Sequence, residues 1–294
     1  MLKSATLLLL LLGDLNFTGL QYMTAFQKAG YDPAFSFQNT SPIIKTADIA
    51  VANLEGPLTF ADWSKESEQK KWRFRQLPIF AKGIKDSGIN ILLLGNNHIA
   101  DSGAQGIQDT IAILKEEGLK WVPAPRDGPL VVERNGFVVD LWNADVFSAP
   151  GSHPWAVSGA ELAKLITERY KGKAKPAIAM AFVHAHFSDR RQADDLSALL
   201  RSAGINWVIL GGEHNPGEMK TDALGGMHYG LGDFIFGCEC SGSTKGKALM
   251  LRVKAGGSEA QEQDVELGSP TNGFVTRFQK SGEAPDGNAL HLNQ

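Results

Sequence analysis

The stretch from Gly88 to Gly103 constrains the fold more than any other part of the chain. An apolar run, Ile91 to Leu94, follows a glycine that ends a predicted helix and stops at another glycine. A short apolar run between turn residues is typical of a strand buried on both faces, as in an α/β sheet. Ligands of open α/β sheets bind beyond the carboxyl ends of the strands. We therefore expect chemistry in the residues that follow this run, although a plain turn would also use them: Asn96, Asn97, His98 and Asp101.

The same pattern returns later in the chain. The sequence from Ser87 to His98 resembles the sequence from Ala203 to His214. In both, a helix end and a glycine precede an apolar strand, which is followed by a second glycine and a histidine. Two such units predict a sheet built from two similar halves, each of which delivers a histidine to the same rim.

The composition is that of an ordinary globular protein. The chain has 294 residues, of which 43% are hydrophobic and 21% charged, and a net charge of −3. It can bury a large core, and no linker divides it, so we predict one domain over residues 1–280 and a polar tail over 281–294. Without a basic block, nothing favours a nucleic acid partner. The only cysteines, Cys238 and Cys240, are poorly spaced for a disulfide and too few for a zinc cage, so we expect neither.

The N-terminal sequence could be either a secretory signal or the first strand of the sheet. Met1 to Thr6 followed by Leu7 to Leu12 resembles the start of a secretory signal. No small-residue cleavage site follows, and the leucine run is too short for a membrane span. We therefore predict that Thr6 to Leu12 is the first central strand, and localisation stays open.

Further chemically capable residues follow other predicted strands. Asp14 follows the first strand, and Glu55 follows a strand over Asp48 to Asn53, although Glu55 alone would fit a turn before Gly-Pro. A strand over 176–183 leads into His184 and His186, which alternate and so point to the same side of an extended segment.

Carboxylate, amide and imidazole groups in one crevice suit a divalent ion such as Mn²⁺, Fe²⁺ or Zn²⁺. We expect one or two ions, since a pair of ions can activate water and bind a phosphoryl oxygen. A nearby histidine that is not a ligand could protonate the leaving group.

Two arginines form a candidate anion site. In the alternating segment Lys71 to Arg75, the side chains of Arg73 and Arg75 lie on one face, opposite Trp72 and Phe74. Guanidinium pairs recognise phosphate or carboxylate, but the alternative is that both are simply solvated.

Helical spacing and stop signals predict the remaining elements. The pair Asn135-Gly136 predicts a hairpin turn. We expect leucines 196, 199 and 200 to face inward on a helix capped by Ser188 or Asp189. Helices are predicted over 20–29, 78–88, 103–117 and 156–171, and from the cap at 188 or 189 to 203. Strands are predicted over 130–134, 137–142, 205–210, 229–236, 247–254 and 272–278.

The order of these motifs resembles the CapA-type capsule-synthesis family. The matching segments, which span roughly residues 6 to 254, are Gly-Asp14, Asn53-Leu-Glu55-Gly-Pro, Asn96-Asn-His98-x-x-Asp101, His184, Gly-x-x-His214 and Tyr229-Gly-Leu-Gly-Asp233-Phe. That family belongs to the calcineurin-like metallophosphoesterase superfamily and is linked to poly-γ-glutamate capsule biosynthesis.

The resemblance implies a fold and a set of roles. The fold is a four-layer α/β/β/α sandwich with metals at the strand ends. Glu55 would bridge two ions, His98 would be a second-sphere acid, and Asp101 would orient the His98 loop. The implied metal ligands are Asp14, Glu55, Asn97, His184 and His214.

The chain departs from the superfamily pattern at two metal positions. Asn16 stands where the superfamily has the histidine of Asp-x-His, and Gly212-Glu213-His214 stands where it has His-x-His. The residues that could compensate are Asn16, His186 and Glu213.

The resemblance implies a metal-dependent hydrolase acting on a phosphoester or an anionic polymer. The alternative is a non-catalytic capsule-assembly component that binds its anionic polymer in the same crevice. Either would work with membrane-associated capsule machinery in the cell envelope.

Overall fold

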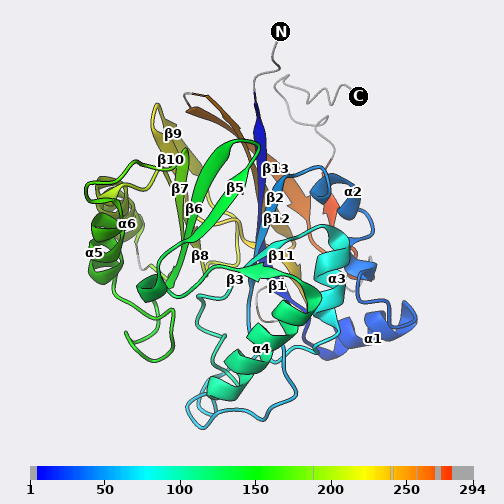
Figure 1. The fold of residues 1–294 in the computed structure, drawn as a ribbon. Helices are drawn as coiled ribbons and strands as arrows, with labels where there is room; N and C mark the ends of the chain where they lie inside the picture. Colours follow the sequence, from blue (N-terminus) through cyan, green and yellow to red (C-terminus); the bar gives the residue numbers. More distant parts are fainter. Residues whose placement is uncertain are drawn as a thin grey trace.

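The structure is a computed structural model that describes residues 5–187, 189–238, 240, 242–255, 257–268 and 273–279. Two β-sheets pack face to face, and helices cover both outer faces (Figure 1). The predicted tail from residue 281 and the alternative helix cap Ser188 lie outside the described residues.

The first sheet has a parallel centre and an antiparallel end. Its strand order is β14-β13-β12-β1-β2-β3-β4, and β11 pairs with the second half of β1. The strands are β1 (Leu7–Asn16), β2 (Ile49–Leu54), β3 (Ile91–Leu93), β4 (Lys120–Trp121), β11 (Asp233–Phe236), β12 (Lys245–Lys254), β13 (Gly257–Glu266) and β14 (Arg277–Phe278).

The second sheet has the order β5-β6-β7-β8-β10-β9. Its central strands β6, β7, β8 and β10 run parallel, and its outer strands β5 and β9 run antiparallel to their neighbours. The strands are β5 (Leu130–Arg134), β6 (Phe137–Asp145), β7 (Ile178–His184), β8 (Trp207–Gly211), β9 (Met219–Asp222) and β10 (Gly225–His228).

Each sheet carries helices on its outer face. The first sheet is covered by α1 (Leu20–Lys28), α3 (Phe80–Ser87) and α4 (Gly103–Glu117), and the second by α5 (Gly159–Tyr170) and α6 (Arg190–Ala203). The short helices are η1 (Phe35–Phe37), α2 (Ser41–Ile44) and η2 (Pro125–Asp127).

The strands alternate between two apolar layers because successive side chains point to opposite faces of a sheet. In β1, Leu9 and Leu11 pack between the two sheets, whereas Leu10 and Leu12 pack beneath the helices. A third buried cluster joins α5 and α6 to the second sheet. Three apolar layers between four structural layers confirm the α/β/β/α sandwich.

Local sequence rules account for most element ends. Gly88 and Gly118 end α3 and α4 in the left-handed conformation, as their positions predict. Asn135 and Gly136 both have positive φ, at 52° and 80°, and form the predicted hairpin between β5 and β6. Asp189 caps α6 by accepting a hydrogen bond from the Gln192 amide.

Three expectations were wrong. Leu199 is 41% exposed and does not join the core, because Leu196 and Leu200 already fill the inward face of α6. The two similar units do not share one sheet: β3 lies in the first and β8 in the second. Cys238 and Cys240 form a disulfide, since their Cα atoms lie 5.2 Å apart, within the usual range for a bridge.

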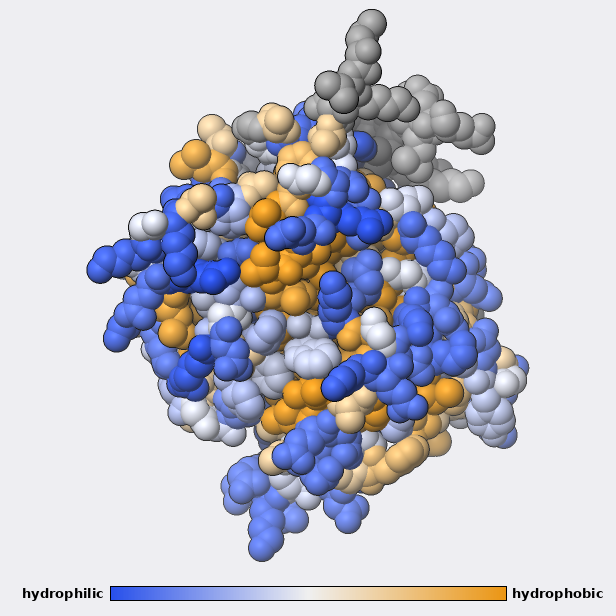
Figure 2. All heavy atoms as spheres, in the orientation of Figure 1, coloured by the Kyte–Doolittle hydropathy of each residue, from blue (hydrophilic) through white to orange (hydrophobic). Residues whose placement is uncertain are grey.

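Hydrophilic side chains cover most of the face in Figure 2, with hydrophobic ones gathered between them. Within the described residues, no helix combines the length and the apolar character that a membrane crossing requires.

Gly13 allows β1 to lie directly against the loop before β11. A Cβ atom at Gly13 would stand 1.9 Å from the carbonyl oxygen of Gly232, which also accepts the Asp14 amide at 3.0 Å. We expect Gly13→Ala to lower the free energy of unfolding by about 1–3 kcal/mol, because the backbone must move apart. Urea denaturation measures this. Gly257→Ala, where a Cβ meets nothing within 4 Å, is the control and should stay within about 0.5 kcal/mol of wild type; equal losses in the two variants would contradict the argument.

Candidate metal centre

Four acidic and imidazole side chains converge at the ends of the strands. Asp14, Glu55, His214 and Asp233 each offer a ligand atom, and these atoms all lie within 4.8 Å of one another. No other such group of three or more His, Cys, Asp or Glu occurs in the described part of the chain. This acid–histidine cluster is therefore the candidate metal centre.

The sheets bring these residues together by strand register. Asp14 on β1 pairs with Asn53 on β2 and with Asp233 on β11. Glu55 follows β2 directly, and its amide donates to the Leu15 carbonyl at 3.0 Å. The first sheet thus supplies three carboxylates, whereas His214 comes from the loop after β8 of the second sheet.

A chain of amides fixes the Asp14 carboxylate. Asn53 Nδ2 donates to Asp14 Oδ1 at 2.8 Å, and Asn96 Nδ2 donates to Asn53 Oδ1 at 3.1 Å. Asn96 Nδ2 also lies 2.9 Å from the Leu54 carbonyl oxygen. The Asn-Leu-Glu and Asn-Asn-His motifs are therefore physically linked, and Asn96 acts as the support for both.

Asp233 orients His214. Nδ1 of His214 lies 2.9 Å from Asp233 Oδ1, and its ring packs edge-on against Phe236 with centroids 4.7 Å apart. This pairing leaves Nε2 as the ring nitrogen for an ion. Burial opposes the charged form of His214, but Asp233 outweighs it and raises the pKa of the imidazole.

Three of the predicted metal ligands have a buried polar side-chain atom that lacks a hydrogen-bond partner within the described residues. These atoms are Glu55 Oε2, Asn97 Oδ1 and His184 Nε2. Buried polar atoms normally have partners, so each such atom calls for an explanation. Carboxylate, amide and imidazole atoms of this kind are donors that suit a divalent ion.

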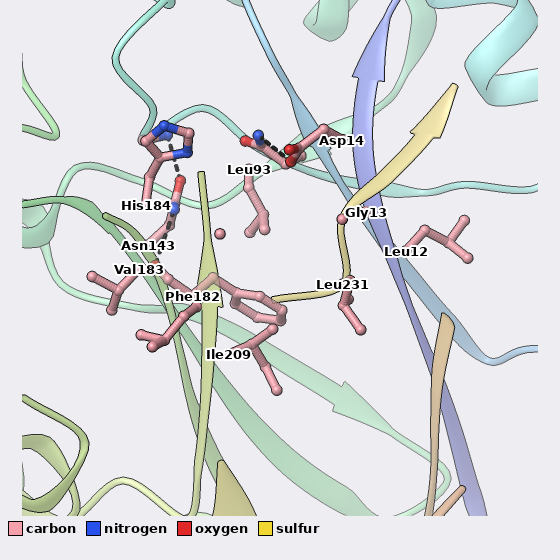
Figure 3. A pocket seen from close by; sticks show the side chains of 15 residues that line it. Leu12, Gly13, Asp14, Leu93, Asn143, Phe182, Val183, His184, Ile209 and Leu231 are labelled. Carbon is pink, nitrogen blue, oxygen red and sulfur yellow. Dashed lines mark hydrogen bonds between the residues drawn. The ribbon is translucent and has the colours of Figure 1, made fainter. Parts of the chain in front are cut away.

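His184 lies at the same end of the site as Asp14. Both line one pocket, above the apolar side chains of Phe182, Ile209 and Leu231 (Figure 3). Burial lowers the pKa of His184 to about 3, although Asp145 opposes this shift. The imidazole is therefore neutral at physiological pH, which is the form that binds metals.

The carboxylates repel one another in this buried position. Burial, and then the charge of Asp233, raises the pKa of Asp14 to about 6. Burial and the charges of Asp14 and Asp233 also raise the pKa of Glu55 well above its ordinary range. A divalent cation would compensate this charge, so the residues present fit a metal.

His98 stands beside the cluster and is held by Asp101. Nδ1 of His98 lies 2.7 Å from Asp101 Oδ2, and Nε2 lies 4.0 Å from Glu55 Oε1. The Phe74 ring packs on the imidazole with centroids 4.1 Å apart. Asp101 thus keeps Nδ1 occupied and leaves Nε2 toward the cluster.

Asn16 and His186, two of the possible compensating residues, already have partners, although the ring centroids of His186 and His184 lie 5.5 Å apart. Oδ1 of Asn16 accepts the Thr18 amide at 3.1 Å, and its Nδ2 lies 3.4 Å from the Glu55 carbonyl oxygen, so its amide supports the backbone. His186 packs on Phe147, and its Nδ1 lies 3.9 Å from the exposed Glu213.

Asp233 is the cluster member that sequence reasoning missed. The sequence rule predicted ligands beyond the carboxyl ends of strands, whereas Asp233 begins the short strand β11. The motif Tyr229-Gly-Leu-Gly-Asp233-Phe was the signal that could have identified it.

The two arginines lie against a tryptophan. The guanidinium groups of Arg73 and Arg75 stand 5.0 and 4.8 Å from the centre of the Trp63 ring. Nη1 of Arg75 donates to the Ala61 carbonyl at 2.8 Å. The two arginines thus share one side, as expected, although the segment is not a regular strand. Trp72 and Phe74 do not share one environment, because Trp72 is exposed and Phe74 is buried.

The fold resembles that of a solved phosphatase structure. A phosphatase structure from Mycoplasma pneumoniae matches with a TM-score of 0.56 at 13% identity, covering 89% of this chain and 94% of that one. This chain therefore shares its fold with that phosphatase structure.

The sequence comparison is more specific. Residues 8–238 match the family described as "Bacterial capsule synthesis protein PGA_cap", and the chain belongs to that family. The capsule biosynthesis protein CapA of Bacillus anthracis is 29% identical over 232 residues, which are 70% of this chain and 54% of that protein. The PGA biosynthesis protein CapA of Bacillus subtilis is 31% identical over 88 residues, 30% of this chain and 23% of that protein. The matched part of this chain thus covers about half the length of the Bacillus anthracis protein and about a quarter of the Bacillus subtilis protein.

The raised pKa of Asp14 predicts a pH-dependent effect of metal on stability. In the metal-free protein the free energy of unfolding falls as pH rises from 3.8 through about 6, because the buried carboxylate of Asp14 must ionise. A bound cation removes this cost, and at low pH protons compete with it. We expect Mn²⁺ to raise the melting temperature more at about pH 7.5 than at about pH 5. Thermal unfolding with and without Mn²⁺ measures both shifts, and a larger shift at the lower pH would contradict the proposed ligands.

Proposed function

We propose that this protein is a metal-dependent hydrolase of the phosphoesterase type that acts on an anionic substrate in capsule biosynthesis. The observation that carries the proposal is the acid–histidine cluster, with His98 and its partner Asp101 directly beside it. The family membership supports the link to capsule synthesis.

The residues divide into two groups of ligands. Asp14, His214 and Asp233 would hold one ion, Asn97 and His184 a second, and Glu55 would bridge them. When bound, such ions lower the pKa of water and neutralise the charge that develops on a phosphoryl oxygen. Mn²⁺, Fe²⁺ and Zn²⁺ suit these oxygen and nitrogen donors.

His98 is the proposed acid. Asp101 accepts a hydrogen bond from Nδ1–H and stabilises the charged imidazole, in which Nε2 carries the proton to be donated. As the water oxygen bonds to phosphorus and the ester P–O bond breaks, Nε2 would protonate the leaving oxygen, and His98 would later regain a proton from solvent. Burial lowers the pKa of His98 and so opposes its charged form, whereas Asp101 favours it.

The substrate is proposed to be an anionic small molecule or polymer. Arg73 and Arg75 are proposed to bind its phosphate or carboxylate groups, since Trp63 supports the faces of both guanidinium groups. Among the described residues, only Nη1 of Arg75 is engaged in polar contacts, by the Ala61 carbonyl and Asp62. The partner machinery is proposed to be the membrane-associated capsule apparatus.

A single substitution tests the acid. We expect His98→Asn to lower kcat by about 10²- to 10⁴-fold, because the leaving group loses its proton donor, while bound Mn²⁺ stays near the wild-type amount. Asp14→Ala should instead lose metal and activity together. The measurement combines hydrolysis of phosphomonoester and phosphodiester probes with elemental analysis of each variant.

The same experiment separates enzyme from binder. Wild-type protein that holds Mn²⁺ and binds an anionic polymer, yet hydrolyses none of the probes, would favour the assembly component. Wild-type turnover in His98→Asn would contradict the acid role alone.

A further inference from the structure

The segment over residues 59–76, here called the strap, is held against the His98 loop mainly by Asp101, through its buried carboxylate and its backbone carbonyl. The side chain of Asp101 is fully buried and accepts three hydrogen bonds. The donors are the Lys70 ammonium at 2.6 Å, the Phe74 amide at 2.8 Å and His98 Nδ1 at 2.7 Å. The carbonyl of Asp101 also accepts the Ser64 amide at 2.9 Å.

Lys70 connects this carboxylate to the neighbouring metal-site residue. Its Nζ donates to the Asn97 carbonyl at 2.5 Å as well as to Asp101 Oδ1. One ammonium group therefore fixes the backbone at Asn97 and the carboxylate that orients His98. The lysine side chain is 36% exposed, whereas Asp101 is 0% exposed, so Lys70 supplies the charge that Asp101 needs in a buried position.

Lys70 is tied to two loop residues, to Asn97 directly and to His98 through Asp101. Asn97 Oδ1 is buried without a hydrogen-bond partner among the described residues, and His98 Nε2 lies 4.0 Å from Glu55. Neither side chain has a helix or regular strand to hold it, because residues 94–102 form a loop. Their directions depend on contacts made by the loop itself.

We propose that Lys70 is a positioning residue of the metal centre, which holds Asn97 and His98 toward the cluster from the strap. This rests in part on the proposed function, because the role concerns the same site. Outer residues that orient ligands typically change metal affinity or activity by about 10- to 100-fold when removed.

The neighbouring lysine provides a matched control. Lys71 is exposed and its Nζ stands 5.0 Å from the Trp72 ring centre. The test compares wild type, Lys70→Met, Lys70→Arg and Lys71→Met by Mn²⁺ titration, by hydrogen exchange of metal-free protein and by hydrolysis of a phosphodiester probe.

Lys70→Met should weaken Mn²⁺ binding by about 10- to 100-fold and lower kcat more than it changes KM. Exchange of the amides over 64–76, including Phe74, should become faster. Lys70→Arg, which keeps the charge and the donors, should recover most of both losses. Lys71→Met should match wild type in every measurement.

Wild-type Mn²⁺ affinity and exchange in folded Lys70→Met would overturn the proposal. A loss shared equally by Lys71→Met would also overturn it, since the effect would then belong to the general charge of the strap. If Lys70→Met does not fold, the double variant Lys70→Met/Asp101→Asn leaves no buried unpaired charge, and its comparison with Asp101→Asn alone isolates the hydrogen bond from Lys70 to the Asn97 carbonyl. If wild type binds Mn²⁺ but hydrolyses nothing, the proposed function fails, while affinity and exchange still decide the role of Lys70.

Discussion

The burial of three carboxylates at one edge of a sheet is the constraint on which the rest of this structure depends. Asp14, Glu55 and Asp233 lie within reach of one another and are almost completely excluded from solvent. Their mutual repulsion and burial raise the pKa values of Asp14 and Glu55. A fold maintains such an arrangement only when surrounding contacts fix it, and here those contacts come from both sheets.

The sandwich supplies that fixation through its strand register. The small residue Gly13 lets the loop before β11 approach β1, so that Asp233 faces Asp14. The second sheet then closes the site with His184 and His214, which follow two adjacent parallel strands. The site therefore lies where the carboxyl ends of strands from two sheets meet, and side chains distant in sequence become neighbours.

Sequence patterns predicted the parts of the fold that depend on local rules. The buried strands, the hairpin at Asn135-Gly136 and the glycine ends of α3 and α4 follow from turn chemistry and apolar runs. The division of β3 and β8 between two sheets did not follow from those runs, because a strand buried on both faces reads alike in either sheet. The capsule-family resemblance, rather than periodicity, indicated the four layers.

The candidate site shows the same division. Glu55 and His214 follow strands and Asp14 lies near the end of β1, so position could select all three, whereas Asp233 begins a strand and was not selected. The support from Asn53, Asn96 and Lys70 depends on contacts across about 27 to 43 residues, which no local pattern contains. Long-range packing therefore decides which polar residues orient the site, even where the motifs themselves are recognisable.

Mn²⁺ titration of Asp233→Asn tests the central claim most directly, because that substitution removes a charge but little volume from the acid–histidine cluster. The account predicts Mn²⁺ binding weakened at least about tenfold, since a carboxylate that also orients His214 is lost. The control is Asp140→Asn, which alters a buried carboxylate on β6 that accepts a hydrogen bond from the Tyr170 hydroxyl. This variant should bind Mn²⁺ as wild type does. Wild-type affinity in Asp233→Asn would contradict the assignment of this cluster as the metal centre.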